Sequence, residues 1–288
     1  MQELVQTKKE VYPYNPTWCP GCGDFAIWAS IKKGIEGTGS PREKIAIFYD
    51  VGCSGDMADF LAYWGFHTLH GRALPTAVGA KLANHDLKVV IVIGDGGCYG
   101  EGGTHFLNLM RGNHDITVIV HNNHRYSLTT GQMSPTTDKG TKTKSTPEGS
   151  VEEPLNPIAI SLTNHASFVA REFAPDIPRL AQRITEGIGH IGFSIIDVLQ
   201  PCPVFNPVQN HEWYRQRMVK LEELGHNPND RKAAWNQVMR DDDKLPIGLF
   251  FQESKPAYHE QVSELSQSPL VNHSIETVNL SALIKEFE

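Results

Sequence analysis

The segment Val89–Asn123 constrains the fold more than any other part of the chain. It begins with five consecutive β-branched residues, Val89–Ile93, which run into the glycine-rich turn Gly94–Gly97. A short apolar run that ends in glycines is typical of a strand buried on both faces of a parallel sheet. A helix is expected to begin near Glu101, and a second β-rich run, Ile116–Val120, follows it. The segment therefore predicts a strand–helix–strand unit of an α/β protein.

Asp95 and Asn123 are expected to lie close together, although they are 28 positions apart in the chain. Each follows one of the two strands, and parallel strands present their carboxyl ends at the same edge of a sheet, where ligands bind. A G-x-G-x-x-G dinucleotide motif is excluded because Tyr99 occupies the position of its third glycine. A carboxylate here would repel a diphosphate unless a cation lay between them, and Mg²⁺ accepts carboxylate, amide and phosphate oxygens together. The pair predicts a diphosphate that is bound through a metal ion.

The composition favours one large globular domain. The chain has 288 residues, of which 40% are hydrophobic and 20% charged, and its net charge is −7. A chain of this size can bury a substantial core. The expected fold is α/β, with a mostly parallel sheet and helices on both faces. It is expected to occupy residues 1–252, followed by a C-terminal tail at 253–288.

Charge and hydropathy exclude two classes of partner. The only basic run is the short segment Lys139–Lys144, so the sequence predicts no nucleic-acid binding. No apolar stretch approaches the roughly 20 residues that cross a bilayer. Because Met1–Asn15 also lacks an apolar signal region, the expected location is the cytoplasm.

Four of the five cysteines lie in turns that suit metal binding. Cys19 and Cys22 form a C-x-x-C loop with Pro and Gly, and Cys53 and Cys202 each lie just past a β-rich run. C-x-x-C loops occur in zinc knuckles, iron–sulfur sites and redox dithiols. From spacing alone, zinc and iron–sulfur remain equally open. Cys98 is expected to be a packed residue rather than a ligand.

The motif Gly94-Asp95-Gly96, followed by Asn122-Asn123, resembles the G-D-G…N-N signature of thiamine diphosphate enzymes. The resemblance implies that the Asp95 and Asn123 side chains coordinate Mg²⁺. It also implies that the backbone carbonyl of Arg125 completes the protein ligands.

Together with the cysteine turns, this motif makes residues 12–255 similar to the β subunits of 2-oxoacid:ferredoxin oxidoreductases. Four further segments carry the resemblance: His-Gly-Arg-Ala-Leu-Pro at 70–75, Tyr-Ser-Leu-Thr-Thr-Gly-Gln at 126–132, Ser-Pro-Thr-Thr at 134–137 and Phe-Val-Ala-Arg at 168–171. The resemblance implies a thiamine diphosphate-binding fold. It further implies that Cys19, Cys22, Cys53 and Cys202 bind one 4Fe-4S cluster. A redox-active cluster also suits the chemistry better than zinc, because an electron-rich thiamine intermediate needs an electron acceptor.

The resemblance also implies the residues that contact the cofactor. His70 and Arg72 are the candidate catalytic residues, and a solvated basic turn is the alternative interpretation for them. The histidines His105, His114, His121 and His124 show no metal-ligand spacing and are expected to be surface or hydrogen-bonded residues rather than metal ligands. The expected cofactor-binding residues are Gly52, Cys53, Ser54, His70, Gly94, Asp95, Gly96, Gly97, Asn123, Arg125, Tyr126, Ser127, Leu128 and Thr129.

The implied activity is the oxidative decarboxylation of a 2-oxoacid, with 2-oxoglutarate ahead of pyruvate. Coenzyme A takes the acyl group, and electrons pass through the cluster to ferredoxin. An α subunit is expected to supply the pyrimidine-binding domain in an (αβ)2 assembly. Asp56 stands where some relatives carry a lysine that meets the substrate carboxylate. The alternatives are a pyruvate:ferredoxin oxidoreductase β subunit, a non-oxidative thiamine diphosphate decarboxylase or synthase subunit, and a zinc-stabilised binding protein.

Apolar periodicity and turn residues predict the remaining elements. The long segment Met133–Pro157 is expected to be a loop that covers the site or contacts a partner. Asp24 is expected to cap the first helix. The expected helices are Asp24–Ile35, Met57–Trp64, Ala73–Asn84, Pro175–Ile188, Gln209–Leu224 and Ser281–Glu288, and the further strands are Phe193–Leu199 and an edge strand, Leu245–Phe251.

Overall fold

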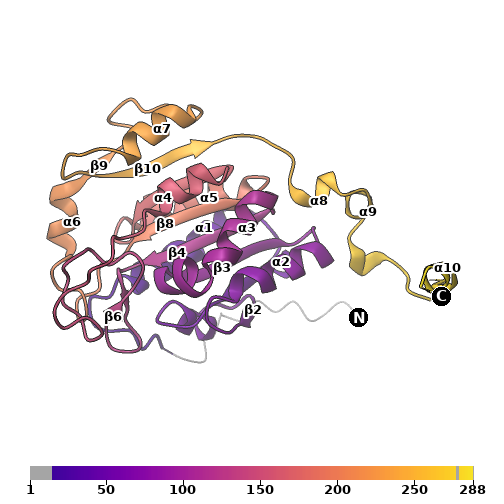
Figure 1. Ribbon diagram of the computed structural model, residues 1–288, viewed down its shortest axis with the longest axis horizontal. Coiled ribbons are helices and arrows are strands. Elements are labelled where there is room, and N and C mark those ends of the chain that lie inside the picture. The colour runs from indigo at the N-terminus through magenta and orange to yellow at the C-terminus, as the bar shows by residue number, and fades with distance from the viewer. Residues whose placement is uncertain (1–14, 277–278, 288) are drawn as a thin grey trace, which may run out of the picture.

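A computed structural model describes residues 15–276 and 279–287 of the chain. Its centre is an eight-stranded sheet with the order β2-β1-β3-β4-β8-β7-β10-β9 (Figure 1). The strands are β1 (Ile45–Tyr49), β2 (Trp64–His67), β3 (Lys88–Gly94), β4 (Ile116–Asn122), β7 (Phe168–Phe173), β8 (Ser194–Leu199), β9 (Met218–Lys220) and β10 (Leu245–Gln252), and a small second sheet pairs β5 (Arg125–Tyr126) with β6 (Gln132–Met133).

Every pairing in the large sheet is parallel except that of β10 with β7. The run Val89–Ile93 lies in β3, where it is buried between β1 and β4. Because β1, β3, β4 and β8 are parallel neighbours, their carboxyl ends meet at one edge. The mostly parallel α/β sheet predicted from the sequence is confirmed.

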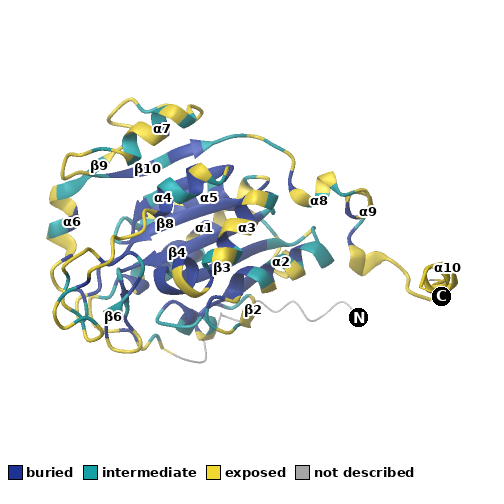
Figure 2. Cartoon of the chain, viewed as in Figure 1, coloured by how far each residue is buried: buried dark blue, intermediate teal, exposed yellow. Residues whose placement is uncertain are grey.

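Helices cover both faces of this sheet, and the buried residues in Figure 2 lie along the strands and the inner sides of the helices. One core places α2, α3, α4 and α7 against the strands, and the other is built around α1 and α5. The helices are α1 (Asp24–Gly37), α2 (Ala73–Ala83), α3 (Gly103–Gly112), α4 (Pro157–Thr163), α5 (Ile177–Gly189), α6 (His211–Arg217), α7 (Arg231–Val238), α8 (Tyr258–Gln261), α9 (Ser263–Ser266) and α10 (Ser281–Lys285).

One of the predicted helices is wrong, and another is predicted too long. Within Met57–Trp64, only a short 3-10 turn forms, and the chain then enters β2, which pairs with β1. Within Gln209–Leu224, α6 ends at Arg217 because Met218–Lys220 pairs with β10. In both places the hydrogen bonds of the sheet override a helical pattern.

Three smaller expectations also need correction. Asp24 does not cap α1, because Gly23 occupies the N-cap and the Asp24 carboxylate is bonded to other side chains. The chain is already helical at Gly96–Glu101, as a π-helical turn that leads into α3. The strand predicted at Leu245–Phe251 exists as β10, but it lies between β7 and β9 rather than at the edge.

The predicted long loop Met133–Pro157 is confirmed, since it contains only the end of β6 before α4 begins. The predicted tail 253–288 extends away from the sheet, carrying α8, α9 and α10 (Figure 1). The helix expected at Ser281–Glu288 forms as α10, whose side chains are exposed. Residues 1–14 of the predicted domain and 277, 278 and 288 of the tail lie outside the described residues.

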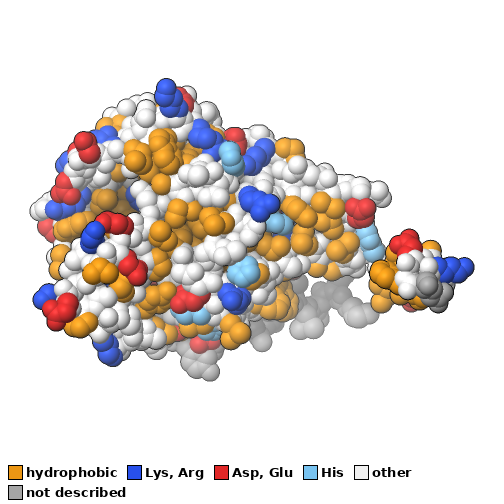
Figure 3. Space-filling view, in the orientation of Figure 1, with side chains coloured by type: hydrophobic (Ala, Val, Ile, Leu, Met, Phe, Trp, Pro, Cys, Tyr) orange, Lys and Arg blue, Asp and Glu red, His pale blue; other side chains and the backbone are white. Residues whose placement is uncertain are grey.

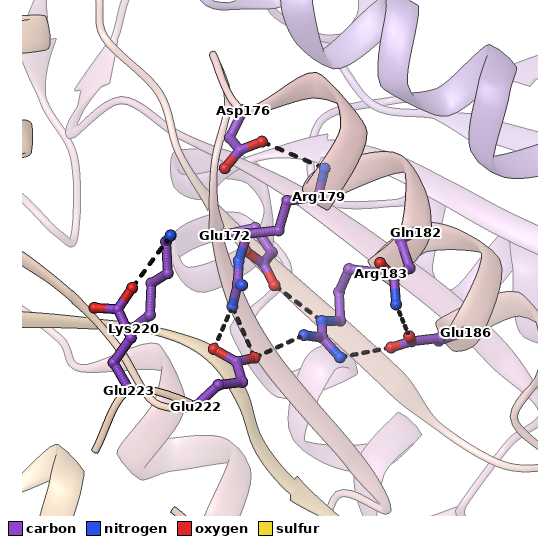
Figure 4. Close-up of polar contacts among 9 residues, drawn as sticks. All are labelled: Glu172, Asp176, Arg179, Gln182, Arg183, Glu186, Lys220, Glu222 and Glu223. Atoms are coloured by element: carbon purple, nitrogen blue, oxygen red, sulfur yellow. Dashed lines mark hydrogen bonds and ion pairs between the residues drawn. The ribbon is translucent and has the colours of Figure 1, made fainter. Parts of the chain in front are cut away.

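An ion-pair network fastens the β9 end of the sheet to α5 (Figure 4). The Glu172 carboxylate on β7 is fully buried and accepts hydrogen bonds from Arg179 (2.6 Å) and Arg183 (2.9 Å) on α5. Both arginines also pair with Glu222, which follows β9. Burial raises the pKa of Glu172 even though Arg183 and Arg179 lower it. The buried carboxylate therefore depends on both arginines to stabilise its charged form.

The surface carries both signs of charge. On the face drawn in Figure 3, the Lys and Arg side chains are interspersed with Asp and Glu side chains. Within residues 15–276 and 279–287, no helix has the length and apolar character needed to cross a bilayer.

Candidate functional site

A cavity opens at the sheet edge where β1, β3, β4 and β8 end. It contains about 510 Å³ of space that protein atoms do not fill, part of it open to solvent. All fourteen residues that the sequence suggested for cofactor binding line this cavity. They come from four separate stretches: 52–54 after β1, His70 before α2, 94–97 after β3, and 123–129 after β4. Their individual roles stay predictions.

Asp95 is a buried carboxylate in the lining of this cavity. Only 1% of the residue is exposed, and its Oδ2 accepts hydrogen bonds from Ser134 Oγ and Thr136 Oγ1, both at 2.6 Å. Burial raises the pKa of Asp95 although these two hydrogen bonds lower it. A bound cation would compensate the desolvated charge. The segment Ser134–Thr137 of the long loop therefore supports the carboxylate end of the cavity.

The turn after β4 brings Asn123 into the lining of the same cavity. Asn123 is buried, and its side-chain oxygen accepts a hydrogen bond from the Arg125 backbone N–H at 3.0 Å. Arg125 donates to the carbonyls of His124 (2.5 Å) and Phe205 (3.2 Å), which fixes the loop that follows. Asp95 and Asn123 thus offer carboxylate and amide oxygens, the donor types that Mg²⁺ takes together with phosphate.

The glycines after β3 are required by close approach of other groups. A Cβ at Gly96 would lie 2.2 Å from the Tyr126 ring, and one at Gly97 would lie 2.0 Å from Asp50 Oδ2. Both distances are shorter than any contact that carbon atoms tolerate. Only glycine at these positions leaves room for the Tyr126 ring and the Asp50 carboxylate.

His70 is held at the cavity wall by Asp50, a residue that the sequence did not single out. The fully buried Asp50 carboxylate bonds His70 Nδ1 at 2.8 Å and accepts from the Gly71 backbone N–H at 2.7 Å. The hydrogen bond to Asp50 raises the pKa of His70 above its usual value. Tyr126 donates to Glu101 at 3.0 Å, and burial and Glu101 together raise the pKa of Tyr126, so its phenol remains protonated.

Arg72 lies apart from this group. Its guanidinium donates to the Glu101 carbonyl at 3.1 Å, and the residue is not part of the cavity lining. Conversely, Val51, His121 and Gln200 line the cavity although the sequence did not suggest them. Buried polar atoms of Ser54 (Oγ), His121 (Nε2) and Gln200 (Oε1) have no hydrogen-bond partner among the described residues. Since unpaired buried polar atoms are costly, these atoms fit a polar ligand.

A second cavity, with about 690 Å³ of unfilled space, adjoins the first and is lined by Cys19, Cys22, Cys53 and Cys202. Trp18 Nε1 donates to the Cys53 carbonyl at 2.8 Å, which ties the C-x-x-C loop to the turn after β1. Within the described residues, no three His, Cys, Asp or Glu side chains are close enough together to hold a metal ion. The fold brings the four cysteines to one cavity, and a 4Fe-4S cluster binds each thiolate to a different iron, so the four side chains need not meet at a single metal ion.

Two thiols of this second cavity, those of Cys22 and Cys53, are not poised as nucleophiles. Burial raises the pKa of Cys53 to about 12. The pKa of Cys22 is also raised, mainly by burial and secondly by the charge of Asp24. A redox dithiol would need the opposite shift. The donor set of four thiolates from three loops fits a metal centre better. Cys98 lies elsewhere, fully buried beside the thiamine-motif turn, as expected.

Five residues line both cavities, so the two share a wall: Cys53, Asn123, Ser127, Leu128 and Gln200. Asp56 lines the cysteine cavity and not the first one.

Comparisons with known proteins agree with this geometry. Residues 50–198 match the family model described as the thiamine pyrophosphate enzyme, C-terminal TPP binding domain. Residues 202–267 match the family model for the C-terminal part of the pyruvate ferredoxin oxidoreductase beta chain.

Two relatives and one solved structure are similar to this chain along most of their length. The chain is 41% identical to the 2-oxoacid:ferredoxin oxidoreductase subunit beta of Saccharolobus solfataricus, over 88% of each chain. It is 34% identical to the 2-oxoglutarate synthase subunit KorB of Archaeoglobus fulgidus, over 86% of this chain and 89% of that one. The fold also matches a 2-oxoglutarate:ferredoxin oxidoreductase from Magnetococcus marinus with 2-oxoglutarate, coenzyme A and succinyl-CoA bound. That match has a TM-score of 0.88 and 33% identity, and covers 98% of this chain and 94% of that one.

Proposed function

The chain belongs to the family of 2-oxoacid:ferredoxin oxidoreductase β subunits, and from this premise we propose a specific role for each of its two cavities. The first cavity binds thiamine diphosphate through Mg²⁺. The second holds one 4Fe-4S cluster. The protein oxidises 2-oxoglutarate to carbon dioxide and succinyl-CoA, and two electrons leave singly through the cluster to ferredoxin.

The observation that carries this proposal is the wall shared by the two cavities. Thiamine diphosphate, when bound, stabilises the electron pair left on the substrate carbon after carbon dioxide departs, and the cluster accepts electrons one at a time. A shared wall containing Cys53 and Asn123 joins a candidate cluster ligand to a candidate magnesium ligand. Such proximity suits electron transfer and gives a non-oxidative decarboxylase no advantage.

The protein's own groups have distinct roles in this scheme. Asp95 and Asn123 hold the metal by their side-chain oxygens, and the Arg125 carbonyl is the third protein ligand. His70, whose Nδ1 is held by Asp50, lines the cavity beside Tyr126, and the centroids of the two rings are 5.8 Å apart. Both are placed to orient a polar substrate group. Arg72 can act only if it moves or if the site is completed by a partner chain.

Membership of a β-subunit family implies partner subunits. We propose that the cavity is covered by an α subunit, which contributes the pyrimidine-binding domain and forms an (αβ)2 assembly. Exposed apolar side chains at this edge support this, because Leu69, which precedes His70, is 78% exposed and Leu128 in the cavity lining is 50% exposed. Exposed apolar groups of this size are typical of a protein–protein interface.

The choice of 2-oxoglutarate over pyruvate is supported by the names of the relatives and by the ligands of the Magnetococcus structure. The second acid group of 2-oxoglutarate needs a cation. Asp56 lines the cysteine cavity and cannot supply one, so the partner chain or Arg72 must do so.

The test is to purify the complex without oxygen and to follow ferredoxin reduction with 2-oxoglutarate or pyruvate, each with coenzyme A. We expect reduction that depends on coenzyme A and is faster with 2-oxoglutarate. Faster reduction with pyruvate would assign the chain to the pyruvate branch. Carbon dioxide release without ferredoxin reduction would support a non-oxidative enzyme, and zinc in place of iron would support a zinc-stabilised protein.

A further inference from the structure

Two pairs of stacked rings attach the C-terminal tail to the domain at α8. The ring of Tyr258 stacks on that of His114, with centroids 4.5 Å apart, and the ring of His259 stacks on that of His85 at 4.8 Å, with the planes 10° apart. His114 lies between α3 and β4, and His85 lies between α2 and β3, so both precede strands whose carboxyl ends form the thiamine cavity. This clasp, made of Tyr258, His259, His114 and His85, therefore lies at the opposite edge of the sheet from the proposed metal and cluster ligands.

Backbone groups of the tail are bonded to the domain directly beside the clasp. The Tyr258 N–H donates to the Asn113 carbonyl at 3.2 Å, and the Asn113 side-chain amide donates to the carbonyls of Lys255 (3.3 Å) and Pro256 (3.0 Å). Ala257, directly before α8, is fully buried. After α8, most of the described residues of the tail are exposed (Figure 2). This short segment is therefore a main attachment of the tail.

The surroundings of His259 disfavour a positive charge on its ring. Lys81, whose side chain is 2% exposed, donates through Nζ to the His85 carbonyl at 2.9 Å and pairs with Asp115 at 2.6 Å. Burial lowers the pKa of His259, and Lys81 and His85 lower it further, although Asp115 and Glu260 raise it. The attached ring is therefore neutral at neutral pH.

The surroundings of His114 have the same effect. Burial, and secondly the neighbouring His259, lower the pKa of His114. Arg111 lines the same pocket as His114 and Tyr258, which adds another positive charge nearby. Once the tail is released, both histidines are exposed to water and regain their ordinary pKa. Because the pKa is lower while the tail is attached, the attachment is stable above the ordinary histidine pKa and weakens as the pH falls through it.

We propose that the clasp holds the C-terminal tail to the domain at neutral pH and releases it on mild acidification, when His259 and His114 take up protons. A charged ring at either position is repelled by the cations beside it, Lys81 and Arg111. None of the clasp residues lines the thiamine cavity or the cysteine cavity, so release of the tail leaves both linings in place. The inference does not depend on the function proposed for those cavities.

The test follows hydrogen–deuterium exchange of the tail in the full chain assembled with its α partner. The reporter is the peptide that contains the Tyr258 amide, which is protected by the Asn113 carbonyl while the tail is attached. Wild type is compared with His259→Phe, because Phe keeps a ring that stacks on His85 and cannot take up a proton. Both proteins are measured at the same pH, so the intrinsic pH dependence of exchange cancels.

At about pH 7.5, the two proteins are expected to exchange equally, since the histidine is neutral in both. At about pH 5.5, one unit below the ordinary histidine pKa, the wild type is expected to exchange about tenfold faster, because one proton taken up on release gives a factor of ten per pH unit. If His259→Phe already exchanges faster at neutral pH, its ring does not stack, and His114→Phe is judged by the same ratio.

A matched control is His273→Phe. His273 is an exposed histidine of the same tail that lies outside the clasp, where its ring bonds Ser268. We expect this control to exchange as the wild type does at both pH values.

Three results would overturn the inference. The first is a ratio of wild type to variant that stays near one at both pH values. The second is equal protection of the tail by His273→Phe. The third is acid-induced exchange that rises together in the tail and in β3 and β4, because it would mean that the whole domain opens rather than the clasp.

Discussion

Replacing Asp95 by Asn separates the binding role of this carboxylate from its effect on the fold. Asn keeps an oxygen that can accept from Ser134 and Thr136, each 2.6 Å from Asp95 Oδ2 in the wild type, but it removes the charge offered to Mg²⁺. Losing a contact to a charged group costs about 1.5–3 kcal/mol. A loss of about 2.7 kcal/mol corresponds to an affinity about 100-fold weaker.

Thermal unfolding converts this loss into a measurable shift. At a thiamine diphosphate concentration of about 100 Kd, with Mg²⁺ present, the ligand stabilises the wild type by about 2.7 kcal/mol. At the same concentration, the variant gains only about 0.4 kcal/mol, since the ligand is then near its Kd. For a domain of this size, Tm moves about 2–4 °C per kcal/mol. We therefore expect a cofactor-induced rise of about 5–11 °C in the wild type and about 1–2 °C in Asp95→Asn.

Without cofactor, the variant should be at least as stable as the wild type at neutral pH. Burial raises the pKa of Asp95 above its value in the unfolded chain. Stability is therefore lost as the pH rises from the unfolded-state pKa through the folded-state pKa, and at higher pH the ionised carboxylate opposes folding. Asp176→Asn is the control, because Asp176 caps α5 and Asn caps a helix equally well. A full cofactor-induced shift in Asp95→Asn would refute the metal-held diphosphate.

Three further outcomes are expected. Cys202→Ser should lose most of the iron of the complex by metal analysis while Cys98→Ala keeps it, and full iron in the first variant would remove Cys202 from the ligand set. NMR titration should give His70 a pKa above its usual value, and Asp50→Asn should lower that pKa; an unchanged His70 pKa would contradict the pairing. Because the pKa is raised in the folded protein, the stability from this pair is present below the unfolded-state pKa and is lost as the pH rises through the folded-state pKa. Arg183→Met should lower the free energy of unfolding by about 3 kcal/mol in urea, since it takes one of two partners from the fully buried Glu172 carboxylate, and wild-type stability would show that the network adds nothing.

Local sequence patterns were sufficient for the parts of the site that follow directly from a strand end. The run Val89–Ile93 and the glycines after it specify both a buried strand and the turn at Asp95, because hydrophobic periodicity and glycine placement are local signals. The turns at Cys53 and Asn123 are of the same kind. All three meet in one cavity because parallel strands end at a common edge.

Long-range side-chain pairs were beyond the sequence patterns. Asp50 bonds a residue 20 positions away, and Asp24 bonds His121 across 97 positions. Neither carboxylate stands in a motif, and His121 has no metal-ligand spacing, so only the packing of α1 against the sheet reveals the second pair. The strand β2 could not be predicted for another reason, since all of its residues are exposed and show no buried periodicity.

The most direct test of the account is whether substrate reduces a cluster in this protein. The αβ complex, prepared without oxygen and loaded with Mg²⁺ and thiamine diphosphate, is mixed with 2-oxoglutarate in the absence of ferredoxin, and the cluster is followed by electron paramagnetic resonance. We predict the signal of a reduced 4Fe-4S cluster in the complex and its absence in the isolated chain treated in the same way. A complex that consumes 2-oxoglutarate while no cluster signal forms would contradict the account.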